Sequence, residues 1–257
     1  MSLVTTEDRG AVRHVVLNRP EKRNAMSQVL LRELGDALRD AAESDSVHCV
    51  VLRGEGPVFS AGVDLGELMA FAGDPAVLRP FRGVFLDCAN LCEEMPKPVV
   101  CQIHGACFGG ALEVALGCDL RVAAAGSQLG LPEVRFGIIP DVGGSSRLPA
   151  VVGLGRAKEL IMTARTIDAT EAHTIGLVNR LAAPEDLERV TQELVDEMLA
   201  HSHVAVGRAK RVMDASARPA LAATLEMEVS VQEYCVAAMR EAAREAEAVA
   251  ASTPATP

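Results

Sequence analysis

Short runs of apolar residues alternate along the chain with longer segments in which apolar residues recur every three to four positions. Two runs, 12–17 and 47–52, are dominated by β-branched residues and predict strands. Between them Ser27 suits a helix N-cap, and one apolar face follows it, formed by Leu30, Leu31, Leu34, Leu38 and Ala41. The first part of the chain therefore predicts a strand, a helix and a second strand.

The alternation continues to about residue 123. Residues 81–95 have a helical period, and Pro96 and Pro98 end it. Residues 99–103 indicate a buried strand, and 120–123 indicate another after a further helical stretch. Strands separated by helices predict an α/β domain in which most strands pair in parallel.

The strand pattern fades from residue 154 onward. The remaining chain predicts helices over 154–163, 168–175, 184–199, 204–214 and 221–250. The last of these is rich in Ala and Glu, with its apolar residues on one side, so it needs a surface to cover, which a neighbouring subunit would supply. We therefore divide the chain into an α/β core over 1–200 and a helical region over 201–257. The helical region serves oligomerisation and ends in a disordered tail from residue 251.

Composition narrows the classes of partner. The chain has 257 residues, 49% of them hydrophobic, which is enough for one large buried core. Its net charge of −10 argues against broad binding to nucleic acid or to anionic membranes. The first residues carry acids where a targeting peptide has basic residues, and no apolar run is long enough to span a bilayer. These features predict a cytoplasmic protein.

The seven cysteines have no C-x-x-C spacing, so we expect reduced thiols. Cys88 and Cys92 would share a helix face with several large apolar residues, which favours a packed core over a metal site. His201 and His203 lack further ligands at zinc-like spacing. We therefore predict no metal.

Candidate chemistry begins at a glycine-rich turn, 104–110, that leads into a helical stretch containing Glu113. Glycines at a helix entrance leave unpaired N–H groups beside the positive end of the helix dipole. A second acid, Glu133, follows in Leu131-Pro132-Glu133. If both carboxyl groups face one ligand, the chain has an oxyanion site and two proton-transfer groups, which suits an enzyme that acts on a polarised carbonyl.

A second glycine turn, 54–65, follows the strand at 47–52. Its amides can meet those of Gly109 and Gly110 at one carbonyl oxygen, the arrangement that enolate-forming catalysis requires. A single turn of this kind is more often an ordinary connection between a strand and a helix. Two such turns together with two glutamates favour the catalytic interpretation.

These residues resemble the crotonase, or enoyl-CoA hydratase/isomerase, superfamily, and most of all its enoyl-CoA hydratases. The resemblance runs from about residue 12 to about residue 210. It is carried, in the family's order, by Asn18-Arg19-Pro20-Glu21-Lys22-Arg23-Asn24-Ala25, Ser60-Ala61-Gly62-Val63-Asp64, 105–113, Gly117-Cys118-Asp119-Leu120-Arg121 and 132–149. It implies a spiral of strand-strand-helix units whose helical C-terminal region forms a homotrimer or a dimer of trimers.

The resemblance also implies a substrate site. The family's oxyanion donors fall on the amides of Ala61 and Gly110, which would bind the thioester oxygen of an acyl-CoA. The positions implied for substrate and CoA are Arg23, Ala25, Ala61, Gly62, Val63, Asp64, Leu65, Gly109 and Gly110. Arg23 matches a basic residue near the CoA phosphates, with a solvated surface charge as the alternative. No cofactor is implied beyond the CoA that the substrate itself carries.

Glu113 and Glu133 match the two acids of the family's hydratases. By resemblance Glu113 takes a proton from water as it attacks C3 of a trans-2-enoyl-CoA, and Glu133 gives a proton to C2, which yields a 3-hydroxyacyl-CoA. This is a step of fatty-acid β-oxidation. The alternative makes Glu113 a first-turn helix acid and Glu133 a loop charge.

Asp141 leaves a second function open. It stands eight residues after Glu133, the spacing of an acidic pair in dienoyl-CoA isomerases, although it could also cap a helix that begins near Gly143. A third possibility is an acyl-CoA-binding scaffold without turnover. The segment 228–250 departs from the family pattern, so the acyl chain length is not readable from it.

Overall fold

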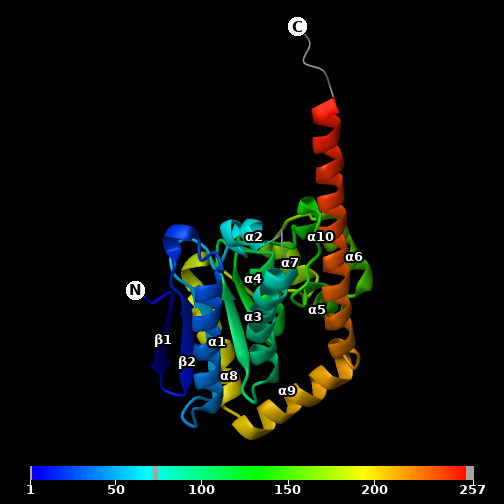
Figure 1. Cartoon of the computed structure of the whole chain (residues 1–257). Coiled ribbons are helices and arrows are strands. Elements are labelled where there is room, and N and C mark those ends of the chain that lie inside the picture. Colours follow the sequence, from blue (N-terminus) through cyan, green and yellow to red (C-terminus); the bar gives the residue numbers. More distant parts are fainter. Residues whose placement is uncertain (1, 72–74, 253–257) are drawn as a thin grey trace.

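A six-stranded sheet forms the centre of the protein. The computed structural model describes residues 2–71 and 75–252. The strands of this sheet are β1 (Val4–Arg9), β2 (Val12–Leu17), β3 (Cys49–Gly54), β4 (Val99–Ile103), β6 (Leu120–Ala124) and β9 (Arg180–Ala182). They lie in the order β1-β2-β3-β4-β6-β9, and every neighbouring pair except β1 with β2 is parallel (Figure 1). Predominantly parallel pairing was predicted correctly. Strand β1 was missed because its outer residues are polar, and β9 was missed because three residues give no periodic pattern in a region predicted to be helical.

Helices cover both faces of the sheet. One face carries α1 (Gln28–Glu43), α3 (Pro75–Glu94) and α4 (Gly110–Gly117), and the other carries α8 (Leu187–Leu199). Strand β3 shows the division: Val50 and Leu52 belong to the core under α1 and α3, while Cys49 and Val51 belong to the core under α8. Burial on both sides explains why the central strands are continuous apolar runs.

The predicted helix after Ser27 is present as α1. The Ser27 hydroxyl accepts a hydrogen bond from the Leu30 amide at 3.3 Å, as an N-cap does. Its buried residues include the four leucines predicted for the core face. Helix α3 begins at Pro75 rather than at 81, and it contains Pro80, which removes one helical hydrogen bond without ending the helix.

A small sheet lies next to the glycine turn. It consists of β5 (Ala106–Phe108), β7 (Gln128–Gly130) and β8 (Ile167–Asp168). Because β5 follows β4 after only two residues and leads directly to α4, it holds Gly109 and Gly110 at the carboxyl end of the main sheet. These short strands were not predicted, since two or three residues give no periodic pattern.

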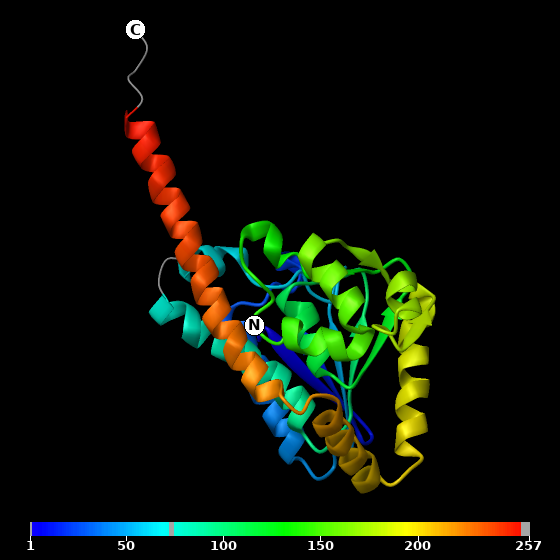
Figure 2. The same cartoon turned by 90° about the vertical axis from the view of Figure 1, so that its right-hand side faces the viewer.

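The remaining elements are mainly C-terminal. They are η1 (Pro20–Lys22), α2 (Leu65–Phe71), η2 (Glu133–Phe136), α5 (Gly144–Val152), α6 (Leu154–Thr163), α7 (Ala169–Thr174), η3 (Pro184–Asp186), α9 (His203–Ala217) and α10 (Leu221–Ser252). Helix α9 crosses one end of the body, and α10 runs back along it and projects past it (Figures 1 and 2). In the predicted disordered tail, 251 and 252 are helical, and 253–257 lie outside the described residues.

Cys88 and Cys92 are fully buried in the apolar core, as the helical stripe predicted. Within the described residues no three His, Cys, Asp or Glu side chains gather as a metal would require. None of the described helices combines the length and the apolar character needed to cross a bilayer.

Candidate active site

Glu113 and Glu133 lie on different elements and line the same cavity. Glu113 is the fourth residue of α4, and Glu133 is the first residue of η2. Their exposed fractions are only 2% and 8%. The cavity measures about 50 Å³, several times the roughly 10 to 15 Å³ that one water needs. The structure therefore brings the two predicted carboxyl groups to one small space.

One oxygen of Glu113 is fixed by backbone amides. Its Oε1 accepts hydrogen bonds from the Val142 amide at 3.0 Å and from the Gly144 amide at 2.8 Å. Gly144 is the first residue of α5, so this oxygen also lies at the positive end of a helix. With Oε1 held in this way, Oε2 is the oxygen left for proton transfer.

Glu133 is held less tightly. Its Oε2 is buried and has no hydrogen-bond partner in the described part of the chain. A Cβ on Gly109 would lie 2.9 Å from Glu133 Oε1, and Gly109 has φ +53°, so both sterics and backbone conformation favour glycine there. An unpartnered carboxyl oxygen in a buried site is costly unless it is protonated or meets a ligand.

The environment holds protons on these acids. Burial raises the pKa of Glu133 to about 7. Burial also raises the pKa of Glu113, and the negative charges of Glu133, Asp141 and Glu228 raise it further. Near neutral pH the pair can therefore hold one proton and have one carboxylate free to accept another, as general acid and base catalysis requires.

Asp141 lines the same cavity. Helix α5 has Gly143 as its N-cap, without a side-chain cap, so the alternative in which Asp141 caps this helix was wrong. Its carboxyl instead lies 3.5 Å from Nε of Arg82, a buried residue of α3. Burial raises the pKa of Asp141 to about 7 although Arg82 opposes the shift. Arg82 was not predicted from the sequence. The only sign of it there is that a basic residue stands in a helix with an apolar face.

The structure corrects one oxyanion donor. The Ala61 amide donates to the Arg23 carbonyl at 2.9 Å, so it is not available to a ligand. Two residues later, the Val63 amide meets no acceptor among the described residues, and Val63 lines the cavity together with Gly110. Gly110 is the first residue of α4, where an amide has no partner within its own helix. Val63 rather than Ala61 is therefore the residue of this turn that lines the cavity with an amide left unbonded, and Gly110 keeps its predicted place.

A groove of about 620 Å³ adjoins the cavity and shares Val63, Leu68, Glu133 and Ile138 with it. Of the predicted CoA-site positions, Ala25, Gly109 and all five residues of 61–65 line this groove. The cations on its wall are Lys22 and Arg135.

Arg23 does not line the groove. It is exposed and has φ +52°, and it contributes the carbonyl that binds Ala61. The basic residue of this loop that lines the groove is its neighbour Lys22, because spacing alone does not show which side chain points toward a cavity. Asp64 is held by Arg19 at 2.7 Å and by the Gly66 amide at 3.0 Å, so its charge is already paired within the protein.

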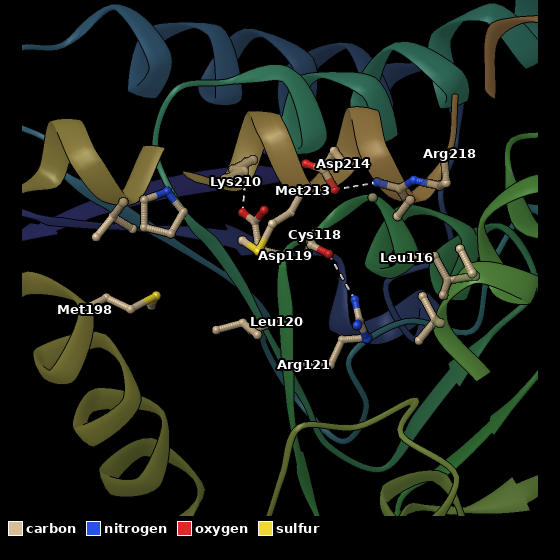
Figure 3. Close-up of a pocket in the computed structure, with 16 residues that line it drawn as sticks. Leu116, Cys118, Asp119, Leu120, Arg121, Met198, Lys210, Met213, Asp214 and Arg218 are labelled. Carbon is tan, nitrogen blue, oxygen red and sulfur yellow. Dashed lines mark hydrogen bonds and ion pairs between the residues drawn. The ribbon is translucent and has the colours of Figure 1, made fainter. Parts of the chain in front are cut away.

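A second cavity, of about 290 Å³, lies at the other end of α4 (Figure 3). Four of its charged side chains form two ion pairs: Lys210 with Asp119 at 2.8 Å, and Arg218 with Asp214 at 2.6 Å. Arg121 donates to the carbonyls of Ala115, Cys118 and Leu177. The Lys210–Asp119 pair anchors α9 to the core, and the cavity contains neither glutamate of the candidate site.

Comparisons with known proteins identify the family of the chain. The sequence profile of the enoyl-CoA hydratase/isomerase family matches residues 7–248. The chain belongs to this family. It is 33% identical to the crotonyl-CoA hydratase of Syntrophomonas wolfei, over 90% of this chain and 86% of that protein. It is 36% identical to the mitochondrial methylglutaconyl-CoA hydratase of Mus musculus, over 92% of this chain and 78% of that protein.

The fold of this family member also matches solved structures. The crystal structure of an enoyl-CoA hydratase from Bacillus anthracis superposes with a TM-score of 0.81 and 32% identity, covering 90% of each chain. The α/β core with a helical C-terminal region is therefore the crotonase fold, as predicted. The named relatives act on different acyl groups, so the family alone does not determine the substrate.

Proposed function

We propose that this protein is an enoyl-CoA hydratase that adds water across the C2=C3 bond of a trans-2-enoyl-CoA. The observation that supports this most strongly is the shared cavity, which is lined by Glu113 and Glu133 and by Val63 and Gly110, the proposed sources of backbone N–H donors. The adjoining groove has room for the CoA moiety and carries Lys22 and Arg135 for its phosphates.

In this proposal the amides of Val63 and Gly110 donate to the thioester oxygen and stabilise the negative charge that develops on it. Ionised Glu113 accepts a proton from water while the water oxygen bonds to C3. The π electrons of C2=C3 move toward C2 and the thioester, and protonated Glu133 delivers its proton to C2. The product is a 3-hydroxyacyl-CoA, and no redox step occurs.

A direct assay tests the proposal. Purified protein is incubated with crotonyl-CoA, and the loss of enoyl absorbance is followed together with the product mass. We expect a product one water heavier than the substrate. Tight binding of CoA esters without conversion of any enoyl or dienoyl ester would support a non-catalytic scaffold instead.

The position of Asp141 supports one alternative, an isomerase. A third proton-transfer group in the same cavity, with its pKa near 7, could serve the far end of a conjugated system together with Glu133. A 3,5-dienoyl-CoA would then be converted without change of mass, and Asp141→Asn would reduce that conversion more than Glu113→Gln. A product heavier by one water would exclude this reading.

We also propose a homotrimer or a dimer of trimers. Helix α10 exposes Met227, Val231 and Tyr234, with 64%, 40% and 75% of their surface open to solvent. Sedimentation of the purified protein would give its mass and distinguish the two assemblies from a monomer. A cytoplasmic location stays a prediction.

A further inference from the structure

The C-terminal helix reaches the candidate active site of its own chain. Helix α10 packs on the body through a stripe that includes the buried residues Leu225, Val229 and Val236 (Figure 2). Two polar residues on this stripe, Glu228 and Gln232, are also buried, each only 4% exposed. They lie one helical turn apart, and both contact the segment 139–146, which precedes and begins α5.

The contacts are hydrogen bonds to specific groups of this segment. Glu228 Oε2 accepts from the Gly143 amide at 2.9 Å, and its Oε1 accepts from the Ser146 hydroxyl at 2.5 Å. Gln232 Oε1 accepts from the Ile139 amide at 3.0 Å, and Gln232 lines the cavity. The segment is thus tied to α10 at three points.

The same segment supports Glu113. Glu113 binds the amides of 142 and 144, and Glu228 binds the amide of 143 between them. Two carboxylates from distant parts of the sequence therefore share the positive end of α5, one from α4 and one from α10. A shift of Gly143 would move both amides on which Glu113 depends.

An apolar stripe alone would be enough to dock a helix. Burying a carboxylate costs free energy unless its partners replace water, and a second carboxylate next to Glu113 adds repulsion. The charged groups that face Glu228 are Arg82 on α3, Asp141 before α5 and Glu113 on α4. Arg82 Nη2 lies 3.9 Å from Glu228 and also donates to the Leu225 carbonyl at 2.9 Å. Docking of α10 alone would not require these polar contacts around Glu228.

We propose that Glu228 is a positioning residue of the active site, through which α10 fixes the turn that holds the carboxyl group of Glu113. The expected effect on catalysis rests on the proposed function, whereas the positioning of the turn rests on the contacts of Glu228 alone. Because Glu228 lies on the same chain as Glu113, each subunit contains this support whatever its oligomeric state.

The kinetic test uses Glu228→Gln, which keeps the shape and removes the charge. Glu226→Gln is the matched control, since Glu226 is exposed on the same helix. We expect kcat for Glu228→Gln to fall about 10- to 100-fold, because small displacements of a catalytic group have effects of that size, while KM stays nearly unchanged.

The pH profile provides a readout that a merely structural role would not move. The negative charge of Glu228 raises the pKa of Glu113, so its removal lowers that pKa. Glu113 must be ionised to act as the base, and the acidic limb of kcat/KM should therefore move to lower pH in Glu228→Gln. Glu228→Asp keeps the charge, so the acidic limb of its kcat/KM profile should stay at the wild-type pH. Its shorter side chain should still lower kcat.

Hydrogen exchange tests the positioning without relying on activity. In Glu228→Ala, peptides that cover 139–146 should exchange about tenfold faster, because a charge-assisted hydrogen bond has been lost, and Glu226→Ala should show no change. If the wild-type protein does not hydrate enoyl-CoA, the proposed function is wrong, and hydrogen exchange alone then tests the positioning role of Glu228. Exchange in 139–146 that is the same in Glu228→Ala and wild type overturns the inference, as does an active wild type whose kcat and pH profile match those of Glu228→Gln.

Discussion

The amide of Ala61 donates a hydrogen bond to the carbonyl of Arg23 at 2.9 Å. This contact joins the loop after β2 to the glycine turn after β3. Asn24 strengthens the junction, since its buried side chain donates to the carbonyls of Glu55, Val58 and Phe59. The turn is therefore fixed from outside, and Val63, whose amide meets no acceptor in the described part of the chain, is its residue that lines the cavity.

Replacing the Val63 amide by an ester should impair catalysis. This backbone substitution removes the N–H and keeps the side chain, so it tests the proposed oxyanion donor directly. We expect kcat for crotonyl-CoA hydration to fall about 10²- to 10³-fold, as for other lost oxyanion donors. The same change at Ala61 removes only the bond to Arg23 and should have the smaller effect on kcat. A larger loss at Ala61 than at Val63 would restore the original assignment.

Glu113→Gln and Glu133→Gln should each reduce hydration strongly. Either change removes a proton-transfer group and preserves the volume, and we expect kcat to fall about 10²- to 10⁴-fold in steady-state assays. Glu245→Gln, on an exposed part of α10, serves as the control. Wild-type turnover in either active-site variant would contradict the assigned roles.

Glu133 should reduce stability above neutral pH. Its pKa of about 7 in the folded protein lies above its ordinary value of 4.5. Between these values the folded state binds more protons than the unfolded chain, so the free energy of unfolding falls as pH rises through this window. Glu133→Gln should therefore be more stable than wild type at pH 8 by about 1 to 3 kcal/mol, with little difference at pH 4. Urea unfolding at both pH values measures this, and equal stability at pH 8 would refute it.

Gly109→Ala should displace Glu133. The new Cβ would lie 2.9 Å from Glu133 Oε1, and φ +53° adds a cost of about 1 to 2 kcal/mol for a residue with a side chain. We expect lower thermal stability and a fall in kcat of about 10²-fold. Gly155→Ala is the control, because a Cβ there meets nothing within 4 Å and the residue lies in helix α6. It should keep full activity.

Much of the framework was predictable because it depends on local patterns. Apolar periodicity located α1 and β4, and Asp168 was recognised at the start of α7, where its side chain accepts from the Glu171 amide at 2.8 Å. The glycine turns and the order of the motifs located Glu113 and Glu133. The short strands β5, β7 and β8 were missed, since their stability comes from pairing with one another rather than from their own sequence.

The sequence by itself determined the family, the two acids and the helix entrance beside them, because spacing along the chain decides which residues begin a helix or follow a strand. Only the tertiary structure decided which amide is free, which cation lines the groove, and that Arg82 and Glu228 surround the acids. The amide of Ala61 and that of Val63 lie in the same motif, and their difference depends on a carbonyl almost 40 residues earlier. Such partners come from distant segments, so their contacts follow from packing and have no signature in the local sequence.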